Sequence, residues 1–228
     1  MATERPIGVY VERGQKKCFA GVIDWPGWCR SARDEEGALQ ALVDYFPRYA
    51  AAIALAGKKP GRPAGVEWLE VIERLEGDAS TDFGAPSAIP EADHRPLDGA
   101  ELARQLAILA ACWEAFEAAA EAARGARLAT GPRGGGRDLA KIREHVDGGD
   151  GAYLSRLGGQ VPREHRGDTV ALRAAFVEAV RARAGGGVPD VGPRGGARWP
   201  ARYGIRRSAW HVLDHAWEIE DRAARPSR

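Results

Sequence analysis

The residues with the clearest chemical potential are two histidines separated by three positions. His211 and His215 belong to the run WHVLDHAWE, residues 210–218. Each residue of a helix turns by about 100°, so these two side chains project from one face, one turn apart. In that geometry two imidazoles can bind one transition metal. The spacing alone also fits an ordinary pair of surface histidines, and both interpretations stay open at this point.

Two further residues are candidates for the same site. His145 flanks the inward positions Ile142 and Val146 of another predicted helix and would supply a third imidazole; alone it also fits a partly buried helix histidine. Glu218 falls on the face of His215 and is a candidate catalytic acid or base, or a residue that supports a ligand; the alternative is a solvated glutamate. Three histidine ligands would leave a coordination position free, as catalytic metal sites do.

The C-terminal part of the chain predicts the helices that would hold these histidines. The first is marked by apolar residues spaced four and three apart, namely Leu102, Leu106, Leu109, Trp113, Phe116 and Ala120. We expect a second helix from about Asp138, a third after the N-cap Asp168, and a fourth over residues 204–222. Gly148 and Gly149 predict a kink or break in the second. The pattern indicates a four-helix bundle.

The N-terminal part has the periodicity of strands. Apolar residues alternate over residues 7–11 and 19–25, and Gly14 lies in a hairpin connection between them. After a short third strand, Asp34 is the expected N-cap of a helix, and residues 66–75 suit a last strand. The predicted order is β-β-β-α-β.

These patterns predict two domains. Residues 1–78 form an α+β domain, and residues 98–228 form an all-α bundle. Residues 79–97, which contain three prolines, are the expected linker.

Composition argues against nucleic-acid and membrane partners. The chain has 33 basic and 32 acidic residues, so its net charge does not attract nucleic acids or anionic membranes. The run GPRGGGR at 131–137 recurs as GPRGGAR at 192–198, and in this balanced chain we interpret both as surface loops rather than RNA-binding segments. The nearly apolar stretch 106–113 is far shorter than the roughly 20 residues that span a bilayer. With no signal-peptide pattern at its start, we expect a cytoplasmic protein.

The C-terminal part resembles the DinB-like proteins. The resemblance is carried by residues 199–222, which include the H-x-x-x-H pair, and by residues 144–158, and it covers about residues 98–224. It implies a four-helix bundle that holds a divalent metal through His145 of the second helix and His211 and His215 of the fourth. Several members are thiol-dependent transferases or isomerases, which implies a low-molecular-weight thiol cosubstrate; others have no known activity.

The N-terminal part resembles the HicB-like antitoxin fold. Residues 21–29 contain the Asp-x-Pro-Gly turn of that family, and residues 34–39 open a helix with acidic side chains. Without a recognisable DNA-binding segment, the resemblance implies a small binding or oligomerisation platform. Trp25 and Trp28 flank the turn and fit a ligand surface or core packing equally well.

We therefore expect a metal-dependent enzyme, a thiol-dependent transferase or hydrolase that acts on a small molecule. Zinc, nickel or ferrous iron suits a site of three imidazoles, whereas magnesium and calcium prefer oxygen. The alternative is a non-catalytic, metal-stabilised binding or regulatory protein that recognises a partner through the HicB-like domain. An open coordination position would favour the enzyme, and a closed four-ligand site the binding protein. A homodimer is an open alternative for the oligomeric state.

Overall fold

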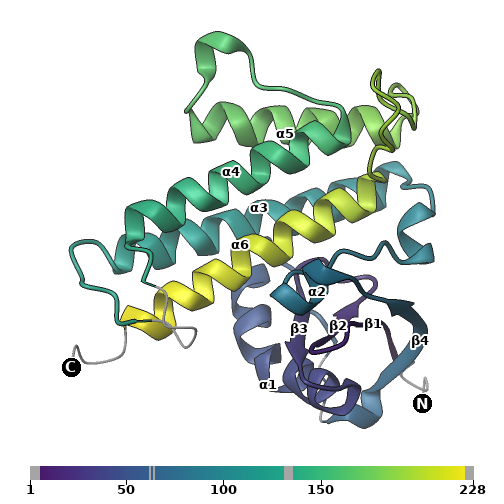
Figure 1. Ribbon diagram of the computed structural model, residues 1–228, viewed down its shortest axis with the longest axis vertical. Helices are drawn as coiled ribbons and strands as arrows, with labels where there is room; N and C mark the ends of the chain where they lie inside the picture. The colour runs from purple at the N-terminus through teal and green to yellow at the C-terminus, as the bar shows by residue number, and fades with distance from the viewer. Residues whose placement is uncertain (1–5, 62, 64, 131–135, 224–228) are drawn as a thin grey trace. The chain divides into compact units, whose positions relative to one another are not determined.

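The chain divides into two compact units, residues 1–95 and residues 96–228. The computed structural model (Figure 1) describes residues 6–61, 63, 65–130 and 136–223. The first unit contains a small mixed sheet and the second is mostly helical, so the chain is α+β overall. The expected linker is instead partly structured: it contains helix α2 (Ala79–Phe83) and the 3-10 helix η2 (Glu91–His94), and up to Arg95 it belongs to the first unit.

A four-stranded sheet organises the first unit. Its elements are β1 (Ile7–Arg13), β2 (Cys18–Val22), β3 (Cys29–Ala32), helix α1 (Glu35–Ala54), the 3-10 helix η1 (Val66–Trp68) and β4 (Leu69–Glu76). The strand order is β3-β2-β1-β4. The first three strands pair antiparallel, whereas β4 lies parallel to β1 and therefore needs the crossover that α1 provides. The predicted β-β-β-α-β order is confirmed.

The turn before β3 places a tryptophan in the core of this unit. Gly27 has a φ of +93°, a conformation that favours glycine, and the amide of Trp28 donates to the carbonyl of Trp25. The Trp28 side chain is fully buried, stacks on Tyr49 and donates from its indole nitrogen to the carbonyl of Leu42. Of the two roles open to Trp28, the structure shows core packing.

A buried carboxylate explains why the segment after β4 is ordered. Glu12 on β1 is completely buried, and its carboxylate accepts hydrogen bonds from the amides of Ser87 and Ala88 and from the hydroxyl of Thr81. A buried charge needs such donors, and the chain after β4 supplies them. These contacts attach the segment to β1.

Four α-helices form the second unit within its described residues. They are α3 (Gly99–Ala122), α4 (Leu139–Leu157), α5 (Thr169–Ala184) and α6 (Ala201–Ala223), with the 3-10 helix η3 (Arg163–His165) before α5. Helix α6 packs against α3 and α4, and α5 packs against α4 (Figure 1). In the described ranges, no helix combines the length and apolar character needed to cross a membrane.

Aspartates begin three of these helices. Asp98, Asp138 and Asp168 each accept backbone N–H groups of the first turn, which satisfies donors that a helix start leaves unpaired. The cap at Asp168 was predicted, and the second helix was expected to begin near Asp138. The break at Gly148 and Gly149 was not correct, because α4 runs through both glycines as one helix.

The second Arg/Gly run forms a tight loop. The amide of Gly192 donates to the carbonyl of Gly196, and Arg198 donates to the carbonyl of Pro189. Positions 131–135 of the first run lie outside the described residues.

Candidate metal centre

Three histidines from two helices of the second unit converge. His145 lies on α4, and His211 and His215 lie on α6. One potential ligand atom of each lies within 4.8 Å of the others, and in the described part of the chain this is the one such cluster of metal-ligating side chains. The Nε2 atoms of His145 and His211 are 3.3 Å apart. The sequence-predicted triad is therefore brought together in space.

The spacing of the nitrogens fits a shared ion. Two nitrogens 3.3 Å apart, each bonded to zinc at about 2.1 Å, subtend about 104° at the metal, close to a tetrahedral angle. The Nε2 atoms of His211 and His145 lie within hydrogen-bonding distance of each other, and Nδ1 of His211 is buried with no hydrogen-bond partner among the described residues. An ion would use the lone pairs of both facing nitrogens.

The electrostatic surroundings keep two of the rings neutral. Burial lowers the pKa of His145, and burial lowers the pKa of His211 well below its usual value; the electrostatic repulsion between the clustered imidazoles acts in the same direction on both. Neutral imidazole is the form that binds metals. These two residues are therefore ready to ligate near neutral pH.

Glu218 orients the third histidine. Its carboxylate accepts a hydrogen bond from Nδ1 of His215 at 2.8 Å and another from Arg222 at 2.6 Å. The bond to His215, with support from Arg222, lowers the pKa of Glu218 to about 2 despite partial burial. With its proton on Nδ1, His215 presents the lone pair of Nε2 to the cluster. The predicted candidate Glu218 thus lies beside the triad as the partner of a ligand.

Arg222, which the sequence analysis did not single out, extends this arrangement to the loop between α3 and α4. It is almost fully buried and donates to the carbonyls of Ala129 and Arg137, each at 2.7 Å. The amide of Ala129 donates in return to the carbonyl of Arg222. The signal in the sequence is the i,i+4 spacing of Glu218 and Arg222 on one helix face.

Gly149 makes room for a candidate ligand. A Cβ atom at this position would lie 2.5 Å from Cε1 and 2.9 Å from Nδ1 of His211. The glycine lets the imidazole lie against the backbone of α4. The sequence predicts a weak point of the helix at this glycine, whereas the structure shows a close approach to His211.

Asp150, also absent from the sequence prediction, ties three helices together next to the histidines. Its buried carboxylate accepts from the hydroxyl of Ser208 on α6 at 2.6 Å and from the indole of Trp113 on α3 at 3.0 Å. Burial raises the pKa of Asp150 to about 6. The hydroxyl of Ser208 ties α4 to α6 about one turn before His211, and the indole of Trp113 ties α4 to α3.

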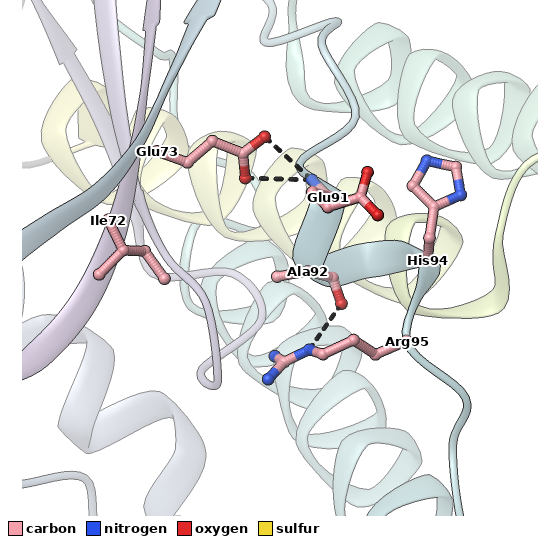
Figure 2. A pocket seen from close by; sticks show the side chains of 6 residues that line it. All are labelled: Ile72, Glu73, Glu91, Ala92, His94 and Arg95. Atoms are coloured by element: carbon pink, nitrogen blue, oxygen red, sulfur yellow. Dashed lines mark hydrogen bonds between the residues drawn. The ribbon is translucent and has the colours of Figure 1, made fainter.

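The remaining histidines lie away from this centre. His94 is in η2 and His165 in η3, and neither joins the cluster. His94 borders an open depression of the first unit, whose lining residues are Ile72, Glu73, Glu91, Ala92, His94 and Arg95 (Figure 2). There Glu73 already accepts from the amide of Glu91, and His94 projects away from Glu73 (Figure 2). Among the described residues, no set of metal-ligating side chains converges on this depression.

Comparisons of the chain with protein families, with curated proteins and with solved structures found no match. The DinB-like and HicB-like resemblances stay predictions.

Proposed function

We propose that the chain is a metal-dependent enzyme. In this proposal His145, His211 and His215 bind one divalent transition metal, and a coordination position stays open for a small molecule. The observation that carries it is the convergence of three imidazoles from two helices, one of them oriented by a carboxylate. Zinc, nickel and ferrous iron suit such a set of nitrogen ligands.

The proposal includes the chemistry of the DinB-like proteins that the second unit resembles, with a low-molecular-weight thiol as cosubstrate and transfer or hydrolysis as the reaction. When bound, an ion of this kind lowers the pKa of water or of a thiol and so supplies a nucleophile near neutral pH. The role of the neighbouring residues is to position the histidine ligands. Glu218 keeps the proton of His215 on Nδ1, and Gly149 admits the ring of His211.

A metal-stabilised binding protein, with a HicB-like first unit as its recognition domain, is the competing function. A purely structural site would need a fourth protein ligand to close the coordination sphere. Within the described residues the cluster contains three side chains, and the nearby carboxylate of Glu218 is already engaged by His215 and Arg222. This arrangement favours the open site.

The ligand set is tested by elemental analysis of the wild type and five single His→Ala variants after chelation and reloading. We expect one equivalent of metal in the wild type and in the two controls, His94→Ala and His165→Ala. The His145→Ala, His211→Ala and His215→Ala variants should lose it. Equal metal content in the wild type and the His211→Ala variant would refute the site.

The open position is tested on cobalt-loaded wild-type protein. Addition of 2-mercaptoethanol should change its visible absorption, because a thiol can enter a vacant or water-filled position. If the spectrum does not respond while the metal is retained, the coordination sphere is closed and the binding protein is the better description.

A further inference from the structure

Arg207 lies one helical turn before His211 on α6 and has a buried donor with no partner. Its Nη1 atom is shielded from solvent and makes no hydrogen bond to any described residue. The guanidinium carbon lies 5.1 Å from the ring centroid of Tyr153 and 4.6 Å from that of Trp210. Two aromatic rings therefore flank the cation, but they do not satisfy the N–H groups of Nη1 as an acceptor oxygen would.

Arg207 and the histidine cluster share an aromatic neighbour. The ring of Tyr153 on α4 contacts the guanidinium of Arg207 and lies with its centroid 5.6 Å from that of His211. Residues four apart on a helix also lie on one face. Arg207 therefore lies on the same face of α6 as His211, one turn away, so a ligand bound at the histidines has Arg207 as a near neighbour.

The charges near the cluster point to the kind of group that Arg207 would receive. The positive charge of Arg222 is paired with Glu218 at 2.6 Å, whereas the buried Nη1 of Arg207 has no hydrogen-bond partner among the described residues. A carboxylate would balance its single charge and match the planar donors of a guanidinium. A phosphate, which carries between about −1.5 and −2 at neutral pH, would bring uncompensated charge against the aromatic rings.

We propose that Arg207 binds a carboxylate of the small molecule that enters the histidine cluster, so that the substrate or the thiol cosubstrate is a carboxylic acid. This inference rests on the proposed function for the identity of the site. Arg207 adds to it the chemical class of the ligand.

The test uses ω-mercaptocarboxylates of increasing chain length, each paired with the mercaptoalcohol of equal length. Affinities for the cobalt-loaded protein are read from its visible absorption, and inorganic phosphate is added as a competitor. For the chain length that fits best, the wild type should bind the acid roughly 10- to 100-fold more tightly than the alcohol, the range expected for a hydrogen bond to a charged group. Phosphate should compete poorly.

Three variants separate a specific contact from general charge effects. Arg207→Gln should abolish the preference for the acid, and Arg207→Lys, which keeps the charge without the planar donors, should retain a small part of it. Arg156→Gln removes an exposed positive charge of the same unit and should keep the full preference. Circular dichroism verifies that each variant is folded, and Arg207→Lys decides the question if Arg207→Gln does not fold.

The outcomes distinguish this inference from the proposed function. If thiols bind the cobalt protein with equal affinity for acid and alcohol, the metal site stands and the role of Arg207 is refuted. If Arg207 only packs between the aromatic rings, Arg207→Gln changes stability and leaves the acid-to-alcohol ratio unaltered, which also refutes it. If the chain binds no metal, the proposed function fails; calorimetry of the same acids and alcohols with the metal-free protein then decides the carboxylate preference by itself.

Discussion

Replacing Gly149 by alanine tests whether the close approach of α4 and His211 matters for metal binding. The new Cβ would lie 2.5 Å from Cε1 of His211, whereas carbon atoms in contact are separated by about 3.5 Å or more. The imidazole would have to retreat by about 1 Å. Metal–ligand distances are satisfied within about 0.2 Å, so a displacement of this size removes His211 from the coordination sphere unless α4 moves with it.

The expected result is a loss of metal affinity without a loss of fold. We expect Gly149→Ala to bind zinc roughly 100-fold more weakly, because displacing a ligand should cost at least as much as the 10- to 100-fold typical of supporting residues. Alanine also favours a helix over glycine by about 1 kcal/mol, which offsets part of the steric cost in the metal-free protein.

Gly148→Ala is the matched control. It makes the same change one position earlier in α4, where nothing lies within 4 Å of the new Cβ. Zinc affinity is measured by competition with a chromophoric chelator, and stability by thermal unfolding of the metal-free proteins. Zinc affinities that are equal in the two variants would show that His211 does not depend on the space at Gly149, and the reasoning would be wrong.

Three further predictions concern the surroundings of the site. Glu218→Gln should weaken zinc binding about 10- to 100-fold, because the charge that fixes the proton of His215 on Nδ1 is lost; an unchanged affinity in the same competition assay would contradict this. Burial raises the pKa of Asp150 from 3.8 to about 6, so folding favours its protonated form, and the resulting stability, full below about pH 4, is lost as the pH rises through about 6. Urea unfolding of the metal-free proteins should therefore show that the free energy of unfolding of Asp150→Asn increases relative to that of the wild type between pH 4 and pH 7, by up to about 3 kcal/mol. A difference between the two proteins that does not change with pH would refute the pKa shift. Residues 96–228 alone should give a helical circular dichroism spectrum with a cooperative thermal transition, since they form a compact unit; an aggregated fragment would show that the first unit is needed for folding.

Local signals in the sequence were sufficient for most of the elements and for part of the site. The apolar spacing of α3, the aspartate cap at Asp168 and the strand alternation of β1 each act over a few residues, and the structure has these elements where they were expected. The four-residue spacing of His211 and His215 is also a local signal. Its geometric consequence follows from helical pitch alone.

The tertiary structure decided what depends on residues far apart in the chain. Glycine is unfavourable inside a helix, so helix propensity does not explain Gly149 in α4. The explanation is the ring of His211 on α6, which leaves no room for a Cβ atom at position 149. Likewise the carboxylate of Asp150 finds its donors on α3 and α6, and the carboxylate of Glu12 finds its donors in a segment expected to be a linker. Propensities and caps act through neighbours in sequence, whereas steric fit and the pairing of buried polar groups depend on which surfaces meet after folding.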